Sequence, residues 1–291
     1  MEESQERFRM SDGFELFYRH WRPVGEVKRV VLCMHGIEAH SGAFRFLGDE
    51  LAAEQTEVYA IDRRGFGNSR EKSPSKGDTK DFNRHLQDVN EAVRYIHKNH
   101  PGKKLFMLGH SLGTFYTLSY VANHPNLLDG IILAAPPVDS GVKLPTGDTL
   151  KFPFLLLFRP RTLYDFVDKW PRAFRESEEY RLLTADPLCT KEFGVRWLVS
   201  VQRTLANKAL ECASRIEEPT LVIQGEQDII ALPSGARKLM ERVTARDKSL
   251  RTLPDADHWF YHAIIPNIGS KYALEQRRQV SDTIRSWLEA H

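Results

Sequence analysis

Short runs of consecutive apolar residues alternate along this chain with longer segments in which apolar residues recur every three or four positions. The runs at 30–34, 105–108 and 128–134 have the length and composition of strands buried on both faces of a sheet. The segment 82–98 has the periodicity of an amphipathic helix and ends at a Pro-Gly pair. Strands that alternate with helices predict βαβ units, so we expect an α/β fold with a mostly parallel central sheet.

The same reasoning places the other core elements and separates them from an insertion. Further strands are expected at 14–21, 57–61, 220–224 and 249–253, and further helices at 44–55, 114–121, 234–243 and 272–288. Between 138 and 215 the alternation stops, and five prolines stand among short segments rich in Phe, Leu and Trp. We therefore predict three parts: the first part of the core (1–137), an inserted cap over the C-terminal edge of the sheet (138–215) and the second part of the core (216–291).

A Gly-His-Ser-Leu-Gly sequence at 109–113 lies between an expected strand and an expected helix. Gly-x-Ser-x-Gly at such a turn is typical of a nucleophile elbow. The turn holds Ser111 in a strained conformation near the positive end of the helix, and only small neighbours let the chain pass on either side. By itself this pattern occurs at structural turns as often as at catalytic serines. A catalytic role therefore also requires a base, an acid and an oxyanion hole.

Two later loops supply an acid and a base in the order Ser, Asp, His, which is the order in α/β-hydrolases. Asp228 follows the expected strand 220–224, and His258 follows 249–253. We expect His258 to remove the proton of Ser111, and Asp228 to orient His258 and stabilise its imidazolium form. Asp139 is the alternative acid, and Asp257 is expected to cap a turn.

Two loops are expected to provide the oxyanion hole. The donors are the backbone N–H groups of Leu112, directly after the nucleophile, and of Ile37, after the strand 30–34. Each such donor typically contributes about 3 kcal/mol to transition-state stabilisation. We expect His35 to order the Ile37 loop by hydrogen bonds, and Asp62 and Arg64 to form a structural ion-pair network in their own loop.

At this point the chain resembles the monoglyceride lipase / lysophospholipase-like branch of the serine α/β-hydrolases. The residues that carry the resemblance are His-Gly-x-x-x-His-Ser-Gly (35–42), Asp-x-Arg-Gly-x-Gly-x-Ser (62–69), Gly-His-Ser-x-Gly (109–113), Gly-x-x-Asp (225–228) and His258, with Asp-Pro (186–187) in the cap. The resemblance implies the α/β-hydrolase fold, with helices on both faces of the sheet and an inserted helical cap. It also implies a monoacylglycerol or another single-chain ester as substrate, no cofactor, and Ile37 and Leu112 as oxyanion donors.

Departures from the pattern leave the substrate open among a monoacylglycerol, a lysophospholipid and a small ester. Ala39 stands where the group usually has Glu, Thr114 stands where a second Gly is common, and the segment 260–270 is longer than usual. In the cap, Phe152, Phe154, Leu155 and Phe158 are either ordinary core or face an acyl chain or a lipid surface, with Lys151, Arg159 and Arg161 near headgroups.

Composition and charge exclude several other functions. The 41 basic and 39 acidic residues leave a net charge of +2, which gives no electrostatic reason for a nucleic-acid partner. Three widely spaced cysteines indicate neither a disulfide framework nor a zinc site. His258 and His262 are four residues apart, but no third ligand accompanies them, so no metal is expected.

The N-terminus is acidic and polar, unlike a signal peptide, and the longest apolar run is too short to cross a bilayer. We expect a cytoplasmic protein that touches membranes transiently at most, with an oligomeric state that the sequence leaves open. Ser111 excludes a dehalogenase, which needs a carboxylate at the elbow. A general carboxylesterase, a perhydrolase and an aminopeptidase share the triad, and the rival of another class is a non-catalytic ligand-binding protein on a hydrolase scaffold.

Overall fold

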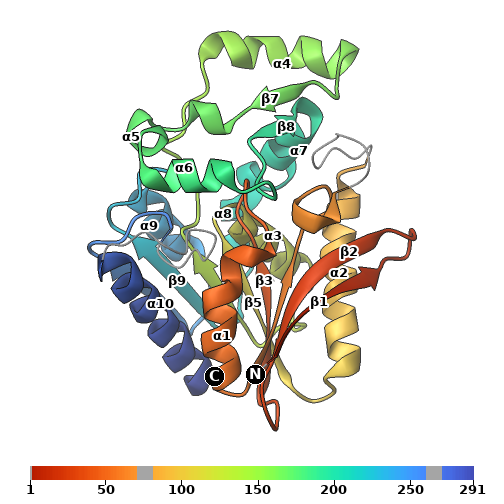
Figure 1. The fold of residues 1–291 in the computed structure, drawn as a ribbon, viewed down its shortest axis with the longest axis vertical. Helices are drawn as coiled ribbons and strands as arrows, with labels where there is room; N and C mark the ends of the chain where they lie inside the picture. The colour runs from red at the N-terminus through yellow and green to blue at the C-terminus, as the bar shows by residue number, and fades with distance from the viewer. Residues whose placement is uncertain (1, 71–80, 260–270) are drawn as a thin grey trace.

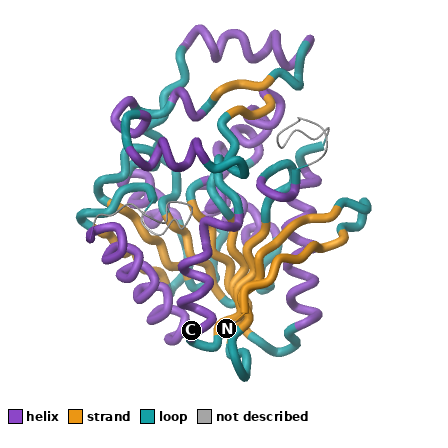
Figure 2. Tube along the Cα trace, viewed as in Figure 1, coloured by secondary structure: helices purple, strands orange, loops and turns teal. Residues whose placement is uncertain are grey.

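An eight-stranded sheet forms the centre of the computed structural model, which describes residues 2–70, 81–259 and 271–291 (Figures 1 and 2). The strand order is β1-β2-β4-β3-β5-β6-β9-β10. The strands from β4 to β10 run parallel, and only β1 and β2 are antiparallel to their neighbours, which confirms the predicted mostly parallel sheet. The bounds are β1 Glu2–Arg9, β2 Glu15–Arg22, β3 Arg29–Met34, β4 Thr56–Ile61, β5 Lys104–His110, β6 Gly130–Ala134, β9 Thr220–Gly225 and β10 Lys248–Leu253.

Helices cover both faces of this sheet, which is why its inner strands read as continuous apolar runs. In β3, Val30 and Leu32 pack into one core while Val31 and Cys33 pack into the other. The first core also receives α2 (Asn83–Asn99), α3 (Leu112–Asn123), α8 (Ala209–Ala213) and α9 (Pro233–Arg242). The second receives α1 (Arg45–Ala53) and α10 (Lys271–Ala290), which lie together on the opposite face (Figure 1).

The remaining elements between β6 and β9 lie over the C-terminal ends of the parallel strands (Figure 1). They are α4 (Thr146–Phe158), β7 (Leu163–Asp165), α5 (Arg172–Arg175), α6 (Glu178–Ala185), β8 (Glu192–Gly194) and α7 (Val195–Thr204), with β7 and β8 paired as a small antiparallel sheet. Short 3-10 helices are η1 (Ser41–Phe44), η2 (Gly67–Ser69), η3 (Val167–Lys169) and η4 (Ala206–Lys208). Although α8 falls within the predicted cap range, it packs against α3 and α9 of the core.

The N-terminal strand β1 has no counterpart among the expected elements. Its sequence is polar apart from Phe8, so it lacks the apolar alternation that marks a strand. It is held instead by a continuous antiparallel register with β2 and by the stacking of Phe8 on Tyr18, whose ring centroids are 3.8 Å apart. An edge strand can keep polar side chains on its surface because backbone pairing holds it in place.

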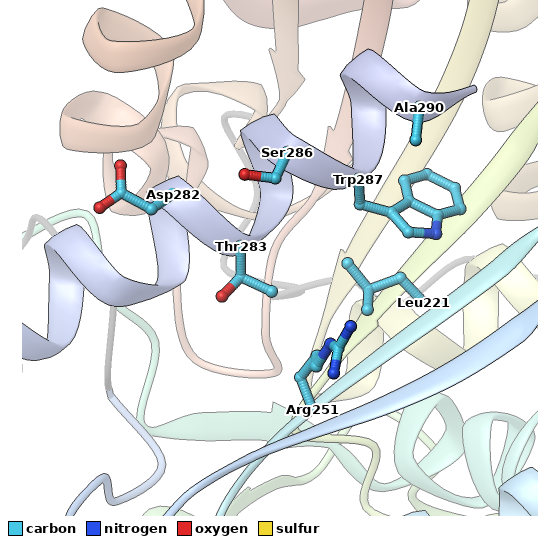
Figure 3. A pocket seen from close by; sticks show the side chains of 7 residues that line it. All are labelled: Leu221, Arg251, Asp282, Thr283, Ser286, Trp287 and Ala290. Carbon is cyan, nitrogen blue, oxygen red and sulfur yellow. The ribbon is translucent and has the colours of Figure 1, made fainter.

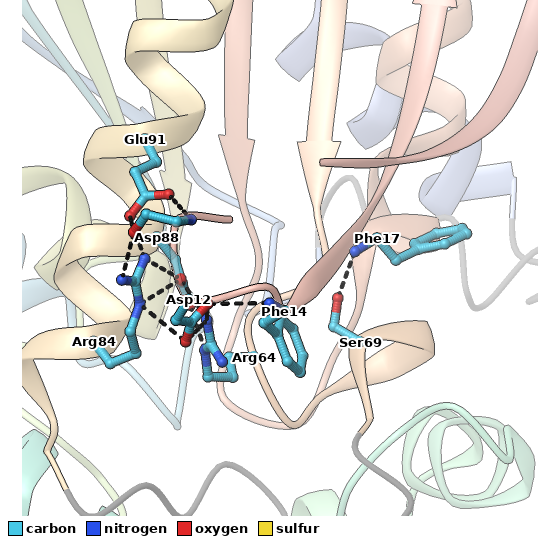
Figure 4. Close-up of polar contacts among 9 residues, drawn as sticks. Asp12, Phe14, Phe17, Arg64, Ser69, Arg84, Asp88 and Glu91 are labelled. Carbon is cyan, nitrogen blue, oxygen red and sulfur yellow. Dashed lines mark hydrogen bonds and ion pairs between the residues drawn. The ribbon is translucent and has the colours of Figure 1, made fainter. Parts of the chain in front are cut away.

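The expected ion-pair network between Asp62 and Arg64 is wrong. Arg64 reaches to helix α2 and the β1–β2 loop, where it binds Asp88 and Asp12 (Figure 4). Asp62 instead accepts hydrogen bonds from the backbone N–H groups of Ser41 (2.6 Å) and Asn68 (2.7 Å). Both residues are structural, but they hold different segments, because the guanidinium is long enough to leave its own loop.

Among the described residues, no helix is long and apolar enough to cross a membrane.

Candidate active site

Ser111 occupies the turn between β5 and α3 with backbone angles of φ 50° and ψ −122°, which a non-glycine residue rarely adopts. A Cβ atom on Gly113 would lie 2.0 Å from the carbonyl oxygen of Met34. One on Gly109 would lie 2.5 Å from the backbone of Gly113. The predicted strain at Ser111, and the need for small neighbours on both sides, are therefore confirmed.

Asp228 and His258 meet at the C-terminal ends of β9 and β10. The Nδ1 atom of His258 lies 2.7 Å from Oδ2 of Asp228, and both side chains are almost completely buried. The other carboxylate oxygen, Oδ1, accepts hydrogen bonds from the backbone N–H groups of Ile230 and Ala231, both at 2.8 Å. These two bonds fix the orientation of the carboxylate, so that Oδ2 faces the imidazole.

Two opposing effects act on the pKa of His258. Burial alone lowers it, because the protonated ring loses solvation, but the charge and hydrogen bond of Asp228 favour the protonated ring and the net shift is upward. The Nε2 atom of His258 is buried and, within the described ranges, has no hydrogen-bond partner. Nε2 is therefore available to accept a proton from a nucleophile.

His110 joins the loop of the serine to the loop of the histidine. Its Nε2 atom lies 3.0 Å from the carbonyl oxygen of His258, and the two rings have centroids 4.9 Å apart. Because His110 precedes Ser111 directly, this contact brings the elbow beside His258. The structure thus gathers the three predicted residues at one edge of the sheet.

The two other candidate aspartates, Asp139 and Asp257, make structural contacts. Asp139, the alternative acid, binds Ser234 (2.6 Å) and Lys238 (2.7 Å). The hydrogen bond from Lys238 lowers the pKa of Asp139, as expected for a surface ion pair. Asp257 accepts a hydrogen bond from the backbone N–H of Trp259 at 2.8 Å, which is the expected turn cap.

The loop that carries Ile37 is held through the carbonyl oxygen of Gly36. The backbone N–H of Arg63 donates to Nε2 of His35 (3.1 Å), which leaves Nδ1–H of His35 to donate to that oxygen (2.8 Å). The Arg63 side chain donates to it as well (2.5 Å). In a trans peptide the C=O of Gly36 and the N–H of Ile37 point in opposite directions, so fixing the carbonyl also fixes the direction of the proposed oxyanion donor. The predicted ordering role of His35 is confirmed.

Arg63 was not among the residues expected to contribute to the site. Its guanidinium is buried and stacks near the rings of Phe66, Tyr116 and Trp197, at 4.8, 5.1 and 5.9 Å from their centroids. The Arg-Arg pair at 63–64 was a visible signal. However, the two side chains diverge, and only the folded chain shows which of them supports the loop after β3.

A pocket of about 170 Å³ opens beside His258, between the cap and the loops after β9 and β10. Most of its lining surface is apolar and comes from residues such as Phe174, Ile230 and Trp259, while Glu179 and Asp257 also line it. Trp259 stacks on Trp170 and Phe174 of the cap, which closes one side. The adjacency of Trp259 to His258 was the only sequence signal for this lining.

The four residues expected to bind substrate all lie on α4 and do not line this pocket. The side chains of Phe154 and Phe158 are 60% and 63% exposed. Phe152 packs edge-on against Tyr164, and Leu155 is partly buried. Because Phe154 and Phe158 are exposed on the outer side of the cap, they are better placed to contact a lipid surface than to contact an acyl chain in the pocket.

A second pocket, of about 440 Å³, lies between α10 and strands β9 and β10 (Figure 3). Arg251, Asp282, Thr283 and Trp287 are among its lining residues. Parallel sheets bind ligands at the C-terminal ends of their strands, where the loops of Ser111, Asp228 and His258 meet. This pocket is therefore separate from the candidate active site.

His40, Asp186 and Cys189 bring three potential metal-ligand atoms close together. Both ring nitrogens of His40 are already engaged: Nδ1 accepts from the N–H of Gly42, and Nε2 lies 3.1 Å from Asp186. We assign the His40–Asp186 contact to fastening the cap to the loop of Ile37. His262, the other residue considered for a metal, lies outside the described residues.

Comparison with known proteins yields one family and a consistent set of relatives. The family model described as "Serine aminopeptidase, S33" matches residues 25–264. The human monoglyceride lipase is 29% identical over 277 residues, covering 93% of this chain and 88% of its own length. The monoacylglycerol lipase of Mycolicibacterium smegmatis is 24% identical and covers 99% of this chain and 98% of itself. The crystal structure of the Paleococcus ferrophilus monoacylglycerol lipase aligns with a TM-score of 0.77 at 23% identity, over 94% of this chain and 99% of that one.

Proposed function

Since the chain belongs to the serine aminopeptidase family of α/β-hydrolases, we propose that it is a monoacylglycerol lipase, a serine hydrolase that cleaves single-chain acyl glycerols. The names of its relatives, which it matches over nearly their whole length, support the substrate class. The observation that carries the proposal is the buried Asp228–His258 pair beside the strained Ser111. An intact set of these three groups also argues against a purely ligand-binding role.

In the proposed reaction, Ser111 Oγ attacks the ester carbonyl carbon while Nε2 of His258 takes its proton. Asp228 stabilises the imidazolium that forms, and the N–H groups of Ile37 and Leu112 bind the oxyanion. Collapse of the tetrahedral intermediate breaks the bond to the glycerol oxygen, which receives the proton from His258. Water, activated by His258, then hydrolyses the acyl-enzyme and releases the fatty acid.

The apolar pocket beside His258 supports an acyl chain as the group it receives. Phe174, Trp259 and Ile230 offer aromatic and aliphatic surface, and each methylene group that they bury contributes about 0.8 kcal/mol to binding. We expect kcat/KM to rise with acyl length across a series of monoacylglycerols and to exceed that for lysophospholipids of equal length. A higher kcat/KM for lysophospholipids would identify a lysolipid as the substrate instead, and a higher kcat/KM for short p-nitrophenyl esters would identify a small ester.

An aminopeptidase is the second candidate, because the family description names that activity. It requires recognition of a free ammonium group and cleavage of an amide. Aminoacyl p-nitroanilides added to the same panel distinguish the two candidates. Turnover of these amides without turnover of monoacylglycerols would favour the peptidase.

We also propose that the outer side of α4 contacts lipid surfaces. Leu150, Phe154, Leu157 and Phe158 are between 60% and 75% exposed there, and the basic residues Lys151, Arg159 and Arg161 lie nearby in the sequence. An exposed apolar helix face beside basic side chains is typical of a helix that lies in the membrane interface.

The double substitution Leu157→Asp and Phe158→Asp is expected to weaken sedimentation with anionic phospholipid vesicles at least tenfold. Each lost apolar side chain removes about 1.5–3 kcal/mol of burial in the interface. Val24→Asp is the matched control, because Val24 is 81% exposed but lies in the β2–β3 connection. Turnover of a short water-soluble ester should stay unchanged in both variants, and equal vesicle binding by all three proteins would contradict the proposal.

A further inference from the structure

Glu38, the residue after the proposed oxyanion donor Ile37, carries a buried carboxyl group. It is 1% exposed, and neither side-chain oxygen has a hydrogen-bond partner among the residues that the structure describes. A buried polar group left in this way is costly, and such groups are rare in proteins unless they have a function. The reaction of Ser111, His258 and Asp228 makes no use of Glu38.

The carboxyl group of Glu38 and the side chain of Ser111 both lie close to Gly36. A Cβ atom built on Gly36 would lie 3.4 Å from Nδ1 of His110, 3.5 Å from Cβ of Ser111 and 3.6 Å from Oε2 of Glu38. The nucleophile and the carboxyl oxygen therefore border the same small space above Gly36. Ile37 follows Gly36 directly, and the direction of its N–H is fixed by the bonds to the Gly36 carbonyl.

The charged and titratable groups around Glu38 come from five segments. Arg63 follows β4, His40 shares the loop of Glu38, His258 follows β10, and Cys189 belongs to the cap. His110, at the end of β5, places Nδ1 beside the same point above Gly36. Burial raises the pKa of the Glu38 carboxyl, and the positive charges of His258, Arg63 and His40 only partly oppose this effect. A protonated carboxyl is a hydrogen-bond donor, and a carboxylic acid kept neutral by an apolar site can serve in an oxyanion hole.

We propose that Glu38 is a catalytic residue, a neutral carboxylic acid that donates a third hydrogen bond to the oxyanion formed when Ser111 attacks the substrate. The proposal rests on the proposed function, because it needs an acyl oxygen at Ser111. Ile37 and Leu112 supply two backbone N–H donors, and Glu38 O–H supplies the third from the space above Gly36. When Glu38 ionises, its carboxylate repels the oxyanion, so activity falls on the alkaline side while protonation of His258 sets the acidic side.

Two substitutions separate this role from a structural one. Glu38→Leu removes the donor and is expected to lower kcat about 100-fold, as for the loss of one oxyanion donor, with KM within about threefold of wild type. Its Tm should equal or exceed that of wild type, because an apolar group replaces an unsatisfied polar one. Glu38→Gln keeps a neutral donor, so it should retain most of kcat while losing the alkaline decline of the wild-type pH profile.

Glu57→Gln is the matched control, because Glu57 is also a buried carboxyl group but binds His20 and Tyr59 in the β2–β4 region. It should change neither kcat nor the alkaline decline. A Glu38→Leu variant with kcat within threefold of wild type would overturn the proposal. So would a Glu38→Gln variant that loses as much activity as Glu38→Leu or keeps the wild-type alkaline decline.

The rate at which a fluorophosphonate probe labels Ser111 tests Glu38 without any substrate, since the phosphoryl oxygen occupies the oxyanion hole. We expect labelling to slow in Glu38→Leu and to be retained in Glu38→Gln. Wild-type protein that labels but does not hydrolyse monoacylglycerols would refute the proposed substrate, while the labelling rates would still decide on Glu38. Equal labelling rates in wild type and Glu38→Leu would refute the third donor alone.

Discussion

Replacing Ser111 by alanine is expected to lower kcat for p-nitrophenyl esters by about a million-fold, as for other serine nucleophiles that act with a histidine. The substitution removes Oγ but keeps Cβ, so the loss is chemical. The elbow should tolerate alanine, because Ala135, at the end of the neighbouring strand, already adopts φ 49°. A Tm close to that of wild type would confirm that the fold is intact.

Ser119→Ala is the control for this experiment. Ser119 lies on the same helix α3, two turns beyond the elbow, and is buried away from the triad. Its loss should leave turnover and fluorophosphonate labelling unchanged, while Ser111→Ala abolishes both. If the Ser111→Ala variant retained turnover, the proposed serine mechanism would be refuted.

Replacing Asp228 by asparagine should lower kcat by about four orders of magnitude, as the loss of the carboxylate does in other triads. The backbone N–H groups of Ile230 and Ala231 both donate to Oδ1, and an amide NH₂ cannot accept them. The asparagine oxygen therefore takes the Oδ1 position, and its NH₂ group faces Nδ1 of His258. The imidazole then carries its proton on Nε2, the atom that must accept the proton of Ser111.

The pH profile gives a second readout for Asp228. His258 must be neutral to act as a base, so wild-type kcat/KM falls as the pH drops through its raised pKa. Without the carboxylate the two largest upward effects on the pKa of His258 are lost while burial still lowers it, so the residual activity of Asp228→Asn should persist to lower pH. Asp139→Asn is the control and should stay within a fewfold of wild type, because Asp139 pairs with Lys238. A large loss in Asp139→Asn with little in Asp228→Asn would reverse the assignment.

Features that depend on local pattern could be predicted from the sequence. A strand buried on both faces must be apolar throughout, so the run at 30–34 identified β3 and, with its neighbours, the parallel sheet. The elbow could be identified because only glycine fits at 109 and 113, where a Cβ would overlap backbone atoms. The positions of Asp228 and His258 followed from loop order along such a sheet.

Features that depend on which partners a long or polar side chain contacts could be identified only from the tertiary structure. Strand β1 is held by backbone pairing with β2, which leaves no apolar signal in its sequence. Arg63 and Arg64 are adjacent, yet one supports the Gly36 carbonyl and the other binds α2. A flexible side chain can reach several neighbours, and only packing selects one.

The substrate side of the site shows the same division. The sequence by itself determined the proposed reacting groups, because backbone strain and strand order limit where a serine, an aspartate and a histidine can meet. It did not determine which residues line the pocket. Of the four residues expected on α4, two are exposed to solvent, while Phe174 and Trp259 line the pocket beside His258. It also gave no sign that Glu38 is buried near Gly36 with no hydrogen-bond partner among the described residues. Both were decided by the tertiary structure, because burial is set by the cap and loops that pack around a residue.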